Sequence, residues 1–204
     1  MMCGLTERNL GLSMRALVER DDKLADLVEA EDSEIDQLEI VVDDMVVTYI
    51  STHGPAATDC RFVLTASKIA SNLERIADEA TTIARRAREL NGEPLLKPLI
   101  DIPLMATTAQ EMLRAAIDAF VNKQPDETID IIARDRTVDD IYKHLVRELT
   151  GFMASDSKTI TRSLNLMTVA KALERIADHA TNIAEEVFYL HNAQDIRHTI
   201  KHRT

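Results

Sequence analysis

The sequence predicts an all-α protein of six helices, arranged as two tandem three-helix bundles that are related by a pseudo-two-fold axis. The first observation is that 204 residues include only 5 Gly and 5 Pro, where average usage gives roughly 14 and 10. A β-sandwich, a barrel or a βαβ chain needs more turns than this composition supplies. The second is that apolar residues recur at helical spacing between the few breakers. The third is an internal repeat.

The breakers fall in clusters that divide the chain into helical segments. They lie at Gly54-Pro55, at Asn91-Gly92 with Pro94, Pro98 and Pro103, at Pro125, and at Gly151 shortly before Ser155-Asp156. The apolar pattern between them predicts helices near 5–20, 22–52, 57–90, 99–123, 126–152 and 157–191. Only Asp21-Asp22 marks the joint between the first two helices.

Local signals support several of these helix ends. Pro125 followed by Asp126 is a good start, with proline in the first turn and an acid near the positive end of the helix dipole. Asn91-Gly92 is a good stop. The segment 57–90 also carries one continuous apolar stripe, formed by Ile69, Leu73, Ile76, Ala77, Ala80, Ile83, Ala84 and Ala87.

The internal repeat defines the domain organisation. Residues 73–84 read LERIADEATTIA and residues 173–184 read LERIADHATNIA, so ten of twelve positions are identical. Earlier in each half the offset becomes 103, and Tyr49 then corresponds to Phe152. We therefore expect a first three-helix repeat at 1–91, a second at 95–192, and a C-terminal tail at 193–204.

Repeated acid pairs are the candidate functional residues. Glu74 and Asp78 lie four residues apart on one helix face, as do Glu174 and Asp178. The preceding helix of each half adds a further pair at the same spacing, namely Asp32 and Asp36 in the first half and Asp135 and Asp139 in the second. If neighbouring antiparallel helices bring these pairs together, a divalent or trivalent cation would relieve their repulsion. Oxygen ligands of this kind suit Mg, Mn, Ca or Fe.

The alternative is a solvated acidic face without metal. Residues 21–44 hold eleven acids and one lysine, so some alignments arise by chance. His179 is expected to be a surface histidine rather than a ligand. A metal-dependent hydrolase that uses the clustered carboxylates, and a plain helical dimerisation scaffold, are the two other functions these acids leave open.

Charge and composition exclude several classes. A net charge of −11 argues against binding to nucleic acid or to an anionic membrane. The longest uncharged stretch, 45–58, is too short to span a bilayer. Two cysteines are no disulfide framework and suit a reducing compartment. We therefore expect a cytoplasmic protein, which touches a membrane only through partners.

The sequence resembles the PhoU family of phosphate-signalling regulators. The resemblance rests on LERIADHATNIAEEVFYL at 173–190, and on the first E-x-x-x-D motif at 74–78. The entry to the third helix, which contains Pro55, Ala57, Asp59 and Arg61, is similar to that family's P-x-A-x-D-x-R. The acids at 32, 36, 135 and 139 also stand where the family has acids. The resemblance covers essentially the whole chain.

Membership would imply six helices, multinuclear metal binding at the doubled motifs with iron or zinc in some members, and a homodimer in many. It would also imply a non-enzymatic regulator. Such proteins restrain the phosphate-specific ABC transporter, through its ATPase subunit, and act with a sensor histidine kinase to repress the phosphate-starvation response when phosphate is plentiful.

The sequence departs from the family pattern at three places. Ala77 and Ala177 replace the usual glycine, and Cys60 replaces a leucine. The first helix also starts late, because Met2 corresponds to Met105 and nothing before it matches Leu99 or Ile102. We therefore expect the first bundle to be less stable than the second.

Overall fold

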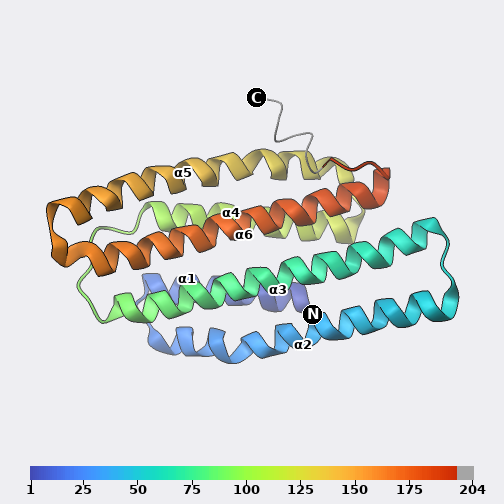
Figure 1. Cartoon of the computed structure of the whole chain (residues 1–204), viewed down its shortest axis with the longest axis horizontal. Coiled ribbons are helices and arrows are strands. Elements are labelled where there is room, and N and C mark those ends of the chain that lie inside the picture. The colour runs from blue at the N-terminus through green and yellow to red at the C-terminus, as the bar shows by residue number, and fades with distance from the viewer. Residues whose placement is uncertain (197–204) are drawn as a thin grey trace.

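A computed structural model describes residues 1–196 of the chain as six α-helices with short connections (Figure 1). Two short 3₁₀ segments, η1 (Pro125–Glu127) and η2 (Ser157–Thr159), precede the last two α-helices. The helices are α1 (Met2–Val18), α2 (Asp22–His53), α3 (Ala57–Asn91), α4 (Asp101–Asn122), α5 (Thr128–Ser155) and α6 (Ile160–Asn192). No strand occurs within 1–196. The predicted fold class is confirmed.

Both ends of α5 differ from the sequence prediction. Pro125 starts the 3₁₀ segment, and α5 begins at Thr128. At its other end α5 continues past Gly151, because a single glycine costs a helix only about 1 kcal/mol. The stop is Asp156 instead, whose carboxylate accepts a hydrogen bond from the Lys158 amide at 2.9 Å and caps the next segment.

The corner between α1 and α2 is fixed by side chains at both of its ends. Asp21 caps α2 by accepting the Lys23 amide at 2.9 Å, which confirms the joint that the Asp21-Asp22 pair predicts. The Arg20 guanidinium donates to the carbonyls of Asn91 and Glu93, both at 2.6 Å. The start of α2 is thus tied to the end of α3, which closes the first bundle.

The two bundles pack against each other through their third helices. Helices α3 and α6 run antiparallel through the middle of the molecule, with α2 on the outer side of one and α5 on the outer side of the other (Figure 1). Helix α1 packs against α3, and helix α4 packs against α6. Helices α1 and α4 also contact each other. The arrangement follows the pseudo-two-fold axis that the repeat predicts.

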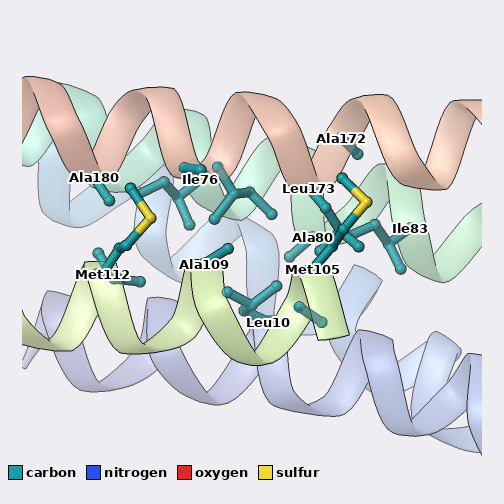
Figure 2. Packing of buried hydrophobic residues seen from close by; sticks show 14 of the residues in the cluster. Leu10, Ile76, Ala80, Ile83, Met105, Ala109, Met112, Ala172, Leu173 and Ala180 are labelled. Atoms are coloured by element: carbon teal, nitrogen blue, oxygen red, sulfur yellow. The ribbon is translucent and has the colours of Figure 1, made fainter. Parts of the chain in front are cut away.

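The core is built from small and aliphatic side chains. Figure 2 shows Leu10, Ile76, Met105 and Leu173 of four different helices packed together, with alanines between them. Alanine lets helix axes approach closely, since it adds little bulk at the contact. Ala77 and Ala177, the residues that replace glycine in the resemblance, are 1% and 0% exposed. Their methyl groups are therefore accommodated in the packed interface. Within residues 1–196, none of the helices is both long and apolar enough to cross a lipid bilayer.

Candidate metal centre and the groove between repeats

The repeated motifs lie midway along α3 and α6, beside the buried apolar stripe of each helix. Leu73, Ile76 and Ala77 are buried, and this places Glu74 and Asp78 at the edge of the same face. The side chain of Glu74 is only 12% exposed. An i,i+4 spacing is what points both carboxylates toward the neighbouring helix.

In the first repeat the acids of α2 and α3 face one another. Burial, the carboxylate of Asp78, and more weakly those of Glu39 and Asp36, raise the pKa of Glu74 to about 7, against the opposing effect of Arg75. Burial also raises the pKa of Asp32; the Thr81 hydroxyl opposes this increase, and Asp36 and Asp78 add smaller increases. We call this group the first acidic cluster; its members are Asp32, Asp36, Glu39, Glu74 and Asp78.

Arg75 is the cation closest to this cluster. Its Nε lies 3.2 Å from Glu74 Oε2, and its Nη1 lies 3.1 Å from Asp78 Oδ2. The Arg75 side chain is 59% exposed, so solvent weakens both attractions. Glu74 Oε2 and Asp32 Oδ1 are both buried; Arg75 is the ionic partner of the first, and the Thr81 hydroxyl stabilises the charged form of Asp32. Buried carboxylates with so few protein partners are costly, and a bound cation would stabilise their charged forms.

The sequence alone did not identify Glu39 as part of this cluster. The offset of 103 pairs Glu39 with Tyr142, so a search for acids that occur in both repeats discards it. The feature of the sequence that could have identified Glu39 is its position one helical turn beyond Asp36, on the same face of the helix.

In the second repeat protein cations already accompany the equivalent acids. Lys171 Nζ donates to Glu174 Oε2 at 2.5 Å and lies 5.5 Å from the centre of the Tyr142 ring. Asp139 Oδ2 lies 3.7 Å from Lys143 Nζ. Asp135 and Asp178 are half-buried. Lys171 corresponds to Ser71 in the first repeat, so this neutralisation belongs to the second repeat alone.

A polar groove of about 780 Å³ runs between the two repeats where α3 and α6 cross. Asp78 and Asp178 both line it, so the two motifs open onto one hollow. Arg175 Nη1 pairs with Glu79 Oε1 at 3.0 Å across the groove. The remaining lining residues are Asp32, Arg75, Thr81, Thr82, Arg85, His179 and Asn182.

His179 differs from the expectation of a surface histidine. The structure places it half-buried, with Nδ1 2.9 Å from Asn72 Oδ1 of α3, an arrangement in which the imidazole donates. Burial lowers its pKa, and Arg75 and Arg175 lower it further, while Asp178 opposes them. The sequence could not show this partial cover, because the contact between repeats that shields one side of His179 is a tertiary feature.

The acids do not form a tight ligand set. Among the described side chains, those of residues 1–126 and 128–196, the one group of three or more His, Cys, Asp or Glu with ligand atoms within 4.8 Å of one another is Asp101, His144 and Glu148. That group is already served by Lys97, which donates to Asp101 at 2.9 Å and also to Glu148. The carboxylates of the first acidic cluster stand further apart. They suit hard cations chemically, but would bind through bridging water or with small side-chain movements.

The class of protein follows from these features. An all-α chain made of two three-helix repeats, with an E-x-x-x-D motif on the third helix of each, is an internally duplicated helical bundle with clustered surface carboxylates.

Residues 1–87 and 102–187 match the family model described as the PhoU domain, and the chain belongs to the PhoU family. It is 38% identical over 199 residues to the phosphate-specific transport system accessory protein PhoU homolog of Pseudomonas aeruginosa, covering 97% of this chain and 82% of that protein. It is 34% identical over 197 residues to the accessory protein PhoU of Escherichia coli, with 97% and 82% covered.

Solved structures agree with this relation. The fold superposes on the crystal structure of PhoU from Pseudomonas aeruginosa with a TM-score of 0.92 at 37% identity, covering 95% of this chain and 93% of that one. The TM-score against the phosphate transport system regulatory protein PhoU from Streptococcus pneumoniae is 0.88 at 25% identity, with 95% and 91% covered.

Proposed function

We propose that this chain is a non-enzymatic accessory protein of phosphate transport that acts in the cytoplasm. It restrains the phosphate-specific ABC transporter through the ATPase subunit, and it represses the phosphate-starvation response through the sensor histidine kinase. The observation that carries this proposal is the match of both repeats to the PhoU domain. Relatives that are similar over nearly the whole chain are named as accessory proteins of the phosphate-specific transport system.

A deletion and complementation experiment tests this role. In high phosphate, a strain that lacks the gene should express phosphate-starvation genes, and the wild-type chain should restore repression. Capture of the ATPase subunit or the histidine kinase by the tagged chain is the matching biochemical result. Normal repression in the deletion strain, together with capture of neither partner, would contradict the proposal.

We further propose that the first acidic cluster binds a divalent or trivalent metal ion, with Fe, Zn, Mn and Mg as the candidates. Asp32, Asp36, Glu74 and Asp78 would hold the ion, and Glu39 would add negative charge. Support comes from the raised pKa values of Glu74 and Asp32 and from the burial of the Glu74 side chain, which is only 12% exposed. The corresponding acids of the second repeat, Asp135, Asp139, Glu174 and Asp178, would bind more weakly because Lys171 already pairs with Glu174.

Exchanging residues between the repeats tests this difference. Ser71→Lys places in the first repeat the ammonium group that the second repeat has, and should lower metal affinity at least about tenfold. Lys171→Ser should instead increase metal binding by the second repeat. Calorimetric titration of chelator-treated protein with Mn²⁺ and Zn²⁺ measures both effects. Thr107→Lys, on the exposed side of α4, adds the same charge elsewhere and serves as the control.

Two outcomes separate this proposal from the alternatives. A metal-free protein whose melting is indifferent to Fe, Mn, Zn and Mg would leave a plain helical scaffold. Phosphomonoester turnover with added Mn or Fe would favour a hydrolase. The homodimer that the family resemblance implies is tested by sedimentation of the intact chain.

A further inference from the structure

A second group of potential metal ligands lies in the second repeat, away from the E-x-x-x-D motifs. Asp101 is the first residue of α4, and His144 and Glu148 lie on α5, which packs beside α4 (Figure 1). One ligand atom from each of these three side chains lies within 4.8 Å of the other two. The group therefore gathers ligands from two helices around one point.

The spacing along α5 explains part of this convergence. His144 and Glu148 are four residues apart, so their side chains share one helix face. Asp101 reaches the same point from the start of α4. By the offset of 103, the first repeat has Val41 and Met45 where the second has His144 and Glu148. The group is therefore not a copy of the doubled motif, and none of the acids discussed above belongs to it.

Lys97 shows that this point already attracts a cation. Its ammonium donates to Asp101 Oδ2 at 2.9 Å and also to Glu148 Oε2. The Lys97 side chain is only 12% exposed, so the ammonium is held between two carboxylates and is mostly shielded from water. The two carboxylates carry two negative charges, and the ammonium balances one of them. A divalent ion at the same point would balance both.

The ligand types select among divalent ions. An imidazole nitrogen beside two carboxylate oxygens suits Zn²⁺, whereas Mg²⁺ and Ca²⁺ prefer oxygen ligands. Zinc holds such ligands at about 2.0–2.2 Å, so the ligand atoms of a tetrahedral site lie roughly 3.3 Å apart. Three atoms within 4.8 Å of one another need only small side-chain rotations to reach that spacing. A water molecule would supply the fourth ligand.

The site is accessible, but a zinc ion must displace Lys97. His144 is exposed, and the side chains of Asp101 and Glu148 are 27% and 33% exposed, so an ion can enter from solvent. Lys97 lies in the connection between α3 and α4, and its long flexible side chain can turn away into water. The loss of its two ion pairs weakens zinc binding, so Lys97 competes with the metal for the same carboxylates.

We propose that Asp101, His144 and Glu148 form a zinc site, in which the ion takes the place of the Lys97 ammonium. Zinc binding would replace a bond between the inter-repeat connection and α5 by a bond between α4 and α5. It would also stabilise the second repeat, because an ion that binds only the folded chain raises its stability. The site shares no residue with the first acidic cluster, so either metal proposal can hold without the other.

Nuclear magnetic resonance of the histidine rings tests the proposal at the site itself. The chain has six histidines, and the ring signal of His144 is the one that His144→Gln removes. When chelator-treated protein is titrated, we expect Zn²⁺ to shift this signal saturably and Mg²⁺ to leave it in place. Lys97→Met should strengthen zinc binding at least about tenfold, because the competing ammonium is gone. Lys97→Gln, which keeps a polar side chain, should strengthen it as well.

Calorimetry with a background that carries Glu74→Gln and Asp78→Asn separates this site from the first acidic cluster. In that background Zn²⁺ should still bind, and adding His144→Gln should weaken the binding at least about tenfold. His191→Gln, which alters another exposed histidine of the second repeat, is the matched control and should change nothing. Circular dichroism should show that all variants keep their helical content.

Three results would overturn the proposal. The first is a His144 signal that Zn²⁺ does not move. The second is a zinc affinity that is unchanged by His144→Gln in the Glu74→Gln and Asp78→Asn background. The third is a zinc affinity that is the same in the wild type, Lys97→Met and Lys97→Gln, because the ion would then not occupy the position of the ammonium.

Discussion

The two repeats carry the same E-x-x-x-D motif but surround it with different charges. In the second repeat Lys171 bonds to Glu174 and lies over the Tyr142 ring, whereas the first repeat has Ser71 and Glu39 at these positions. The carboxylates of the first acidic cluster therefore have the exposed Arg75 as their ion-pair partner, whereas the second repeat adds Lys171 and Lys143 beside its acids. The two repeats have the same helices and the same motif. A few different residues beside the motif give the two motifs different charged neighbours.

The repeats differ equally in how their outer helices are covered. The end of α5 lies under the start of α4, while the corresponding end of α2 projects into solvent. Both differences place the exposed and reactive features in the first repeat. The second repeat is the more fully packed half, and this contrast has measurable consequences.

The largest effect is expected in the core under α4. Leu145→Ala should lower the free energy of unfolding by about 2–5 kcal/mol, because Leu145 is fully packed. Val42→Ala, at the corresponding half-buried position, should cost about 1 kcal/mol or less. Urea titration measures both, and amide exchange should be faster at 40–53 than at 143–155. Equal losses would mean that α2 is covered as well as α5.

The next effect concerns Glu74 and pH in metal-free protein. Burial and the neighbouring acids raise its pKa from 4.5 to about 7, so the native state retains a proton that the unfolded chain releases. The stability from this group is therefore complete below pH 4.5 and is lost as the pH rises through about 7. Glu74→Gln places a neutral amide at this position, so the variant does not lose this stability as the pH rises.

At pH 8 the Glu74→Gln variant should be more stable than the wild type by an amount of the order of 2 kcal/mol, after allowance for solvent screening. At pH 4 the two proteins should be closely matched. Thermal unfolding across this range provides the measurement. Glu174→Gln is the control, since it removes a carboxylate that Lys171 pairs with and should bring no gain at pH 8. If the difference in stability between the wild type and Glu74→Gln did not change with pH, Glu74 would not have the raised pKa described above.

A smaller effect is expected inside the first bundle at Asn9. This residue is completely buried, and neither polar atom of its amide has a hydrogen-bond partner within the described part of the chain. The second repeat has Met112 at the corresponding position, also 0% exposed. Asn9→Leu, a change of similar volume, should raise the free energy of unfolding by about 1–2 kcal/mol. A loss of stability would show that the amide is satisfied, for example by buried water.

The smallest effect lies in the groove between repeats. Glu79 pairs with Arg175 across the groove, while the corresponding position 179 is a histidine. Glu79→His makes the two motifs more alike and should cost less than about 1 kcal/mol, because Arg175 is 56% exposed. The difference from wild type should shrink in high salt. A larger, salt-independent loss would indicate that Glu79 has a packing role.

Much of the fold was predictable because its signals are local. The breakers, the apolar periodicity and the doubled motif determine six helices and their pairing into two repeats. The Asp21 cap and the Asn91-Gly92 stop are likewise set by neighbours in sequence. The exception at Gly151, where α5 continues, arises because a weak helix breaker yields to the packing of Leu149 and Phe152 on the core.

Spacing along the chain fixes which helix face the acids occupy, since residues four apart share a face whatever the rest of the fold. The partners of those acids depend instead on how the helices pack against one another. Glu39 joins the first acidic cluster because α2 lies beside α3, and His179 is covered because α6 crosses α3. The position of Lys171 over the Tyr142 ring likewise needs α6 beside α5, whereas the Lys171–Glu174 pair is an i,i+3 contact within α6. Charge and burial at these positions depend on distances between helices, and such distances are not encoded in the spacing along any one of them.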